Sequence, residues 1–73
     1  MELQKKFGLI IKTLRVEKKL SQEALAFKSN IDRTYIGDIE KGERNISLSI
    51  IERLAKSLQI SISELFKTIE DHE

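Results

Sequence analysis

The sequence contains no cysteine and a single histidine among its 73 residues. Without cysteine, neither a disulfide framework nor a thiolate metal site can form. The chain also lacks a cluster of metal-ligating residues, a Cys/His pair and a glycine-rich phosphate loop, and so small a chain offers little room for a pocket. We therefore expect no enzyme activity, no metal, no cofactor and no small-molecule ligand.

No apolar run approaches the roughly 20 residues that cross a bilayer, and we expect neither a signal peptide nor a membrane partner. The composition indicates a cytoplasmic protein built as one domain, residues 1–73. A chain of this length buries a modest fraction of its surface and is often marginally stable by itself. Since disulfides and thiolate metal sites are excluded, oligomerisation is the remaining source of added stability.

A strong excess of positive charge is absent as well. Thirteen Lys and Arg stand against twelve Asp and Glu, a net charge of +1, so charge alone does not predict binding to phosphate. The distribution is uneven, because residues 1–20 hold six Lys and Arg against two Glu, whereas residues 47–73 hold three against five acids. Nucleic-acid binding by such a chain should depend on geometry and dimerisation more than on bulk electrostatics.

Residues 21–41, SQEALAFKSNIDRTYIGDIEK, predict two short helices joined by a tight turn. Ser21 is suited to cap the first helix and Asp32 the second, while Asn30 stands at the turn because Asn tolerates positive φ. At helical spacing, apolar residues fall on the face of each helix that points into the protein, and the residues of the opposite face of the second helix are mostly polar. The inner ones are Leu25, Ala26, Ile31, Ile36 and Ile39, and the outer ones are Arg33, Thr34, Gly37, Asp38 and Lys41. This pattern is typical of a helix-turn-helix, whose second helix lies in the major groove of DNA.

Three further helices are predicted around this pair, which makes the fold class all-α, a compact bundle of five helices. A first helix covers residues 2–19, where Gly8 indicates close packing, and residue 19 departs from the glycine expected at a helix end. Ser47 is suited to cap a helix over residues 48–58, and a capping box of Ser61 and Glu64 opens a helix over residues 62–69, followed by a frayed end. The inward positions are Leu3, Phe7, Ile10, Ile11 and Leu14 in the first helix, and Leu48, Ile51, Leu54, Ala55 and Leu58 in the fourth.

Arg15 follows the last residue of the first apolar stripe and can turn inward, toward the end of the third helix where Glu40 lies. A buried arginine needs a partner. The sequence therefore predicts an Arg15–Glu40 ion pair that fixes the first helix against the third. The alternative is two independent exposed charges.

The last two predicted helices carry a heavy load of apolar side chains for the end of so short a chain. Some of them must complete the core, and the remainder would leave an exposed patch unless a second subunit covers it. We expect a two-fold dimer interface there, and the alternative places all of these side chains in the core. The candidate interface residues are Ile50, Ile60, Ile62, Leu65 and Phe66.

Residues 20–26, LSQEALA, and residues 33–48, RTYIGDIEKGERNISL, resemble the phage-repressor/Cro (XRE) family of five-helix DNA-binding proteins. The second stretch is most similar to the controller proteins of type II restriction–modification systems, and the likeness runs from Phe7 to Phe66. It implies a lambda-repressor-like bundle that acts as a homodimer on a partly symmetric double-stranded DNA operator upstream of its own gene, in the bacterial nucleoid. Such proteins activate and later repress transcription, which delays nuclease expression until methylation protects the host DNA. Activation implies a contact with RNA polymerase.

The resemblance also implies roles for matching residues. Arg33 is the expected base reader, through guanine O6 and N7, with Thr34 and Tyr35 contacting bases, thymine methyls or phosphate beside it. Gln22 matches a glutamine that grips the phosphate backbone. Further backbone or base-edge contacts are expected from Ser21, Arg44, Asn45 and Ser47.

Asp38 is a less favourable candidate on the same face. A carboxylate near phosphates is repelled unless it accepts a hydrogen bond from a cytosine amine. For Arg44 the alternative to a DNA contact is a solvated loop arginine.

Two other functions share these sequence features. A small phage or plasmid repressor cannot be separated from a controller protein by the sequence. An antitoxin that occupies a toxin through its terminal helices would be favoured by a disordered, toxin-wrapping segment, which the sequence does not show.

Overall fold

Five α-helices and no strand are found in residues 2–72, the part of the chain that the computed structural model describes. This confirms the all-α class and the number of helices. The helices are α1 (Leu3–Glu17), α2 (Gln22–Ser29), α3 (Arg33–Glu40), α4 (Leu48–Ser57) and α5 (Ile62–Asp71).

Three helices begin where serine was predicted to cap them. The hydroxyl of each serine accepts a hydrogen bond from the backbone N–H three residues further on, at 3.0 to 3.2 Å, which satisfies one of the unpaired donors of the first turn. These serines are Ser21, Ser47 and Ser61. Asp32 holds the equivalent position before α3, but its carboxylate makes no such hydrogen bond, so the prediction of a side-chain cap there is wrong.

The helix ends differ slightly from the prediction. α1 ends at Glu17, and the turn after it places Lys19 at φ 59, a left-handed conformation that glycine adopts more readily. Asn30 has the positive φ expected of it, 56. α5 continues to Asp71, so two residues predicted to fray are helical. The longest helix, α1, has 15 residues, and within residues 2–72 no helix has both the length and the apolar character needed to cross a membrane.

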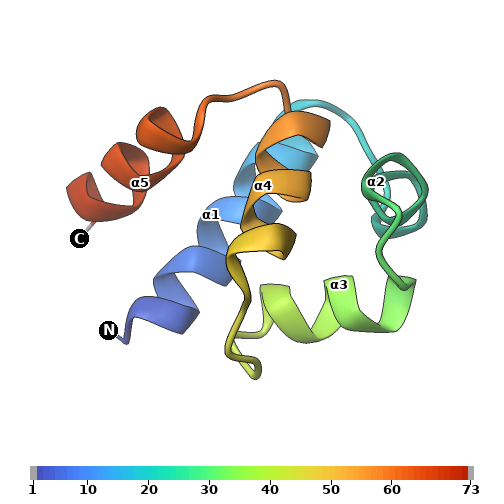
Figure 1. Cartoon of the computed structure of the whole chain (residues 1–73), viewed down its shortest axis with the longest axis horizontal. Coiled ribbons are helices and arrows are strands. Elements are labelled where there is room, and N and C mark those ends of the chain that lie inside the picture. Colours follow the sequence, from blue (N-terminus) through green and yellow to red (C-terminus); the bar gives the residue numbers. More distant parts are fainter. Residues whose placement is uncertain (1, 73) are drawn as a thin grey trace.

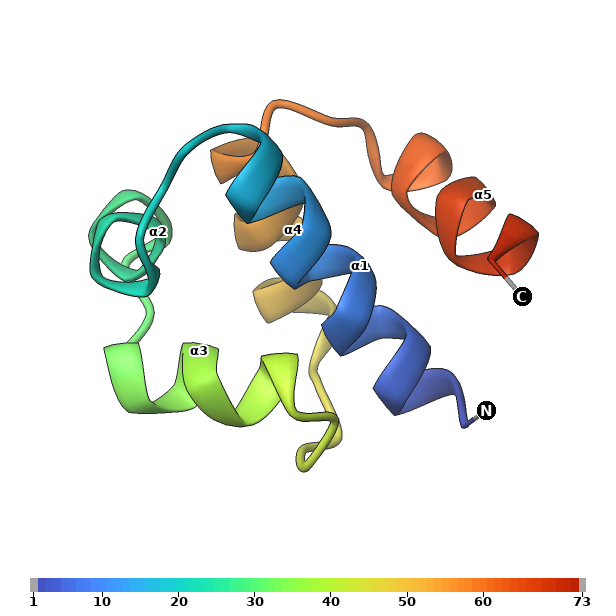
Figure 2. The ribbon, with the colours of Figure 1, turned by 180° about the vertical axis from the view of Figure 1, so that it is seen from behind.

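Seen from either side, α1 and α4 lie in the middle of the molecule (Figures 1 and 2). α2 and α3 lie on one side of this pair and α5 on the other. α1 contacts α3 and α5, α2 contacts α3 and α4, and α4 contacts α5. α3 therefore forms one edge of the molecule, supported from behind by α1 and α2.

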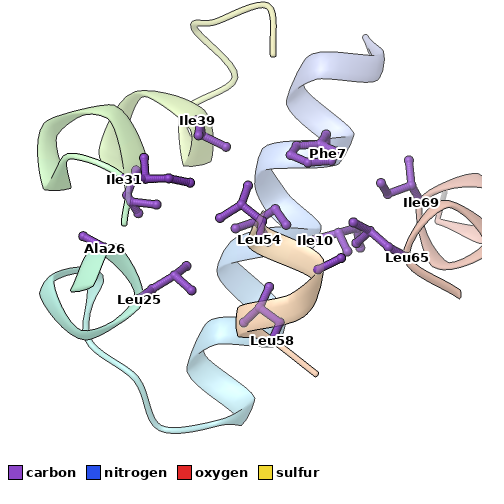
Figure 3. Close-up of a cluster of buried hydrophobic side chains, with 13 residues drawn as sticks. Phe7, Ile10, Leu25, Ala26, Ile31, Ile39, Leu54, Leu58, Leu65 and Ile69 are labelled. Carbon is purple, nitrogen blue, oxygen red and sulfur yellow. The ribbon is translucent and has the colours of Figure 1, made fainter. Parts of the chain in front are cut away.

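The core collects side chains from all five helices (Figure 3). The fully buried ones are Ile11, Leu25, Ile36, Ile39, Leu54, Leu58, Leu65 and Ile69. Leu65 was a candidate for the dimer interface, and that assignment is wrong because its side chain already lies inside the single chain. Ile50, Ile60 and Phe66 are half-buried and pack against the core, whereas Ile62 is exposed.

Two predicted inward positions are exposed instead. Leu3 is 64% and Leu48 83% exposed. Each is the first residue of its helix, and helix side chains lean toward the N-terminus. Both side chains therefore extend beyond the layer of residues that the neighbouring helices cover.

Gly8 lies where α1 crosses α3. A Cβ atom at this position would lie 2.2 Å from the carbonyl oxygen of Ile39 and 2.8 Å from that of Glu40. The two backbones therefore touch, and the close packing predicted at Gly8 is confirmed.

Gly8→Ala should destabilise the fold, because backbone atoms must move to admit the methyl group. We expect a loss of about 1–3 kcal/mol in the free energy of unfolding, the usual range for overpacking. Gly37→Ala is the matched control, since its Cβ would meet only Gln22 Oε1, at 4.0 Å, and alanine favours a helix by roughly 0.5–1 kcal/mol. Urea unfolding followed by circular dichroism measures both. Equal stability of the two variants would contradict the backbone contact.

Candidate nucleic-acid interface

The turn between α2 and α3 is held by the residues that the sequence pattern selected. Leu25, Ala26 and Ile31 are buried, and the backbone N–H of Ile31 donates to the carbonyl of Ala26 at 3.1 Å. Asn30, in the left-handed conformation, reverses the chain just before it. α2, the turn and α3 together form a helix-turn-helix.

The predicted Arg15–Glu40 ion pair is present behind α3. Arg15 Nε lies 2.6 Å from Glu40 Oε2 and Nη2 lies 3.0 Å from Oε1, while Nη1 donates to the carbonyl of Leu20 at 2.8 Å. The side chains are only 11% and 4% exposed. The hydrogen bond to Glu40, strengthened by its charge, raises the pKa of Arg15 above its ordinary value despite burial, so burial does not remove the positive charge of Arg15.

Gln22 joins this pair from the start of α2. Its Nε2 donates to Glu40 Oε1 at 3.0 Å, so the Glu40 carboxylate is shared between α1 and α2. An amide nitrogen carries two hydrogens, so this bond uses one of the two donors of Gln22. The sequence suggested Gln22 as a phosphate contact but did not reveal what orients it.

The first turn of α3 presents Arg33 and Thr34 as exposed side chains, while Tyr35 is half-buried and packs against the core. Arg33 Nε lies 3.4 Å from Glu23 Oε2, in an exposed pair. Gly37, one turn further on, leaves open space on the same helix. The face of α3 that would enter the major groove of DNA is therefore polar, and Arg33 lies at its N-terminal end.

The loop after α3 folds back against the start of α1. Gly42 has φ +74, and a Cβ there would lie 2.7 Å from Lys5 Cγ, so only glycine fits this close approach. The Gln4 amide donates to the side-chain oxygen of Asn45. These contacts fix the loop beside α3, at the same edge of the molecule (Figure 1).

Arg44 lies across the end of this face. Its Nε and Nη2 donate to Asp38 Oδ2 at 3.2 and 3.1 Å, and its guanidinium carbon lies 4.9 Å from the centre of the Tyr35 ring. Asp38 therefore faces Arg44, and the structure gives it a partner that the sequence did not suggest. Arg44 is likewise paired, although its side chain remains 52% exposed.

The structure thus brings most of the sequence candidates to one edge. Gln22 of α2 lies beside Glu40 and Gly37 of α3. Arg44 of the following loop contacts Asp38 and Tyr35 of the same helix. Sequence reasoning missed Glu23 and Gln4, because their partners lie 10 and 41 positions away and no local pattern relates them. The described residues contain no group of His, Cys, Asp and Glu arranged to hold a metal ion.

Comparison with known proteins agrees with this architecture. A protein family described as helix-turn-helix matches residues 11–65. The chain is 46% identical over 70 residues to control protein C.MunI of Mycoplasma sp, covering 94% of this chain and 95% of that protein. It is 44% identical over 70 residues to control protein C.BamHI of Bacillus amyloliquefaciens, covering 92% and 86%. This chain belongs to the helix-turn-helix family of restriction–modification controller proteins.

Solved controller structures share the fold. The controller protein C.AhdI from Aeromonas hydrophila superimposes with a TM-score of 0.83 at 51% identity, covering 86% of this chain and 96% of that one. The controller C.Esp1396I, solved on a 25 base pair operator site, gives a TM-score of 0.88 at 40% identity, covering 96% and 92%. The resemblance predicted from residues 20–48 is therefore confirmed.

Replacing Glu40 by Gln tests the ion pair of this controller fold. Gln keeps the size of Glu but leaves the Arg15 charge without a counter-charge, and removing one partner of a buried pair typically costs about 3–5 kcal/mol. Since Arg15 and Glu40 are slightly exposed, we expect a loss near the lower end of that range.

The matched control is Asp71→Asn, which breaks an exposed pair with Lys67 of 3.5 Å and should change stability by less than about 0.5 kcal/mol. Unfolding must be compared at one protein concentration, because assembly would shift apparent stability. Unchanged stability of the Glu40 variant would contradict a structural role for the pair.

Proposed function

We propose that this protein is the autoregulating transcriptional controller of a restriction–modification system and binds a symmetric DNA operator as a homodimer. The observation that carries the proposal is the polar edge formed by α3 and the following loop, in a chain that shares fold and sequence with controller proteins, one of them solved on operator DNA. A helix-turn-helix places its second helix in the major groove. α3 is that helix here.

In this arrangement Arg33 at the start of α3 reaches a guanine edge, and Thr34 and Tyr35 contact the neighbouring bases or backbone. Phosphate contacts set the position of the helix on the duplex, and the residues suited to them flank the groove-facing helix. They are Ser21, Gln22, Arg44, Asn45 and Ser47. Ser21 and Ser47 accept from the backbone as helix caps, so their hydroxyl hydrogens are free to donate to phosphate.

The dimer interface is proposed on the face formed by α4 and α5, away from α3. A groove there is lined by Leu48, Ser49, Ile51, Glu52, Ile62 and Phe66. A second, mainly apolar groove shares Ile51 and Phe66 with it, extends to Leu3 and Phe7 of α1, and reaches Asn45 in the loop after α3. Exposed leucine and isoleucine side chains over adjoining grooves are typical of a surface that another protein covers. A second copy of the chain would cover it symmetrically.

A dimer of this kind would first activate and later repress its own promoter, in the bacterial cytoplasm on the nucleoid, with RNA polymerase as a further partner. A phage repressor is the second candidate function. The immunity repressor protein of Bacillus phage phi105 is 45% identical over 58 residues, although these cover only 40% of that protein. Methyltransferase and endonuclease genes beside the coding gene would favour the controller.

Binding of the purified protein to DNA from upstream of its own gene tests the function. We expect complexes that form in steps of one dimer and weaken as salt rises, with a shuffled duplex bound less tightly. Arg33→Ala should remove most of this preference, because one bidentate arginine–guanine contact contributes about 1–3 kcal/mol, while weak binding to any DNA persists. Electrophoretic mobility shift measures both proteins. Equal binding of wild type to both duplexes would contradict an operator upstream of the gene.

The oligomeric state tests the proposed interface. Ile62→Glu puts a charge into the groove between α4 and α5 and should convert the dimer into a folded monomer. Phe27→Glu is the matched control, since Phe27 is 89% exposed on α2, on the opposite side of the central pair from α5 (Figure 1). Sedimentation equilibrium gives the masses, and circular dichroism checks the helices. A dimer that survives Ile62→Glu would place the interface elsewhere.

A further inference from the structure

Each arginine of the proposed DNA-binding edge has an acidic partner on that same edge. Arg33 is paired with Glu23 at 3.4 Å, and both side chains are well exposed. Arg44 is held more firmly, by two hydrogen bonds to Asp38 and by the ring of Tyr35. The Asp38–Arg44 pair is therefore the stronger of the two arrangements.

The contacts of Arg44 leave only some of its guanidinium donors available to bind DNA. A guanidinium has five N–H donors, and Asp38 Oδ2 accepts from two groups, Nε and Nη2. One face of the guanidinium is placed over Tyr35, at a distance typical of a cation–π contact. While these contacts hold, the remaining N–H donors can reach a phosphate or a base edge from this position.

A carboxylate and a phosphate oxygen compete for the same guanidinium, because both are anionic acceptors that match its donors. A DNA backbone that approaches at random must draw Arg44 away from Asp38 or accept a repulsive carboxylate nearby. A DNA site whose acceptor matches the position in which Asp38 holds Arg44 meets a side chain that is already ordered. Binding at such a site does not lose the conformational entropy of that side chain a second time. The pair thus weakens indiscriminate phosphate binding more than binding at a fitted site.

We propose that Asp38 is a specificity-determining residue: it holds Arg44 over Tyr35 and so suppresses binding to non-operator DNA. The proposal rests on the proposed function, since it requires an operator to compare with. Asp38 acts through Arg44 and contacts no base. This role also fits a chain whose net charge is only +1, in which acidic groups at the binding edge offset the cations there.

Asp38→Asn tests the proposal in the full-length protein. Asn keeps the shape and removes the charge, so Arg44 is released and repulsion of the backbone falls. Affinity for a shuffled duplex should rise roughly tenfold at low salt, with the slope of log K against log salt steeper by up to about 1.8 for two added phosphate contacts per dimer. Affinity for the operator should change much less, so the ratio of operator to shuffled binding falls.

The charge control is Glu17→Gln. Glu17 ends α1 and lines a surface hollow with Ser57 and Gln59, at the end of α1 that lies away from α3 (Figure 2). Glu17→Gln removes one negative charge, as Asp38→Asn does, but should leave the ratio of operator to shuffled binding and the salt slope unchanged. A matching effect from Glu17→Gln would show that net charge alone acts, and would overturn the role of Asp38.

The second control repeats Asp38→Asn in a chain that also carries Arg44→Gln. If Asp38 acts through Arg44, Asp38→Asn should have little effect on the binding ratio in the chain that carries Arg44→Gln. The difference between its effects with and without Arg44 measures the coupling between the two residues. An equal effect in both backgrounds would overturn the proposal. So would an unchanged ratio, or weaker binding of Asp38→Asn to both duplexes. Wild type first shows whether an operator is recognised, so failure of the proposed function is seen separately.

Discussion

The buried pair of Arg15 and Glu40 is the contact on which the proposed DNA-binding edge depends. Through it α1 is joined to the end of α3, the Arg15 donors reach the carbonyl of Leu20, and Glu40 also binds Gln22 at the start of α2. A charge pair that lies mostly out of water is stable only with all of its hydrogen bonds made. The three helices are therefore fixed together at one point directly behind the face that is proposed to meet DNA.

Contacts between neighbours in sequence were predictable, and contacts set by the path of a loop were not. The serine caps follow from local chemistry. The pairing of Arg15 with Glu40 is an exception, because the two residues are 25 positions apart and the prediction came from the need of a buried charge for a partner. The exposure of Leu3 and Leu48 was not predictable, since helical periodicity does not show where the neighbouring helices end. The assignment of Leu65 to the dimer interface was wrong for a related reason. The number of apolar residues in a helix does not show which of them lie in the core and which on the surface.

The candidate site shows the same division. Helical spacing placed some of its residues on the outer face, among them Arg33 and Asp38, and the family resemblance implied roles for the others. The structure brings Gln22, Tyr35, Asp38 and Arg44 to one edge. Their partners were not predicted, because the position of Arg44 depends on the turn at Gly42 and its approach to Lys5. A sequence pattern shows which side chains can bind DNA. The structure adds which of them are already held by other groups.

The missing side chain at Gly8 has a consequence for the assembled regulator. The contact of α1 with α3 at this glycine sets the angle between the two helices, and α1 also contacts α5 on the proposed dimer face. In the proposed dimer, α1 would therefore link the tilt of each groove-facing helix to the two-fold axis. In that dimer, the separation of the two groove-facing helices would depend on the backbone contact at Gly8, independently of which bases are read.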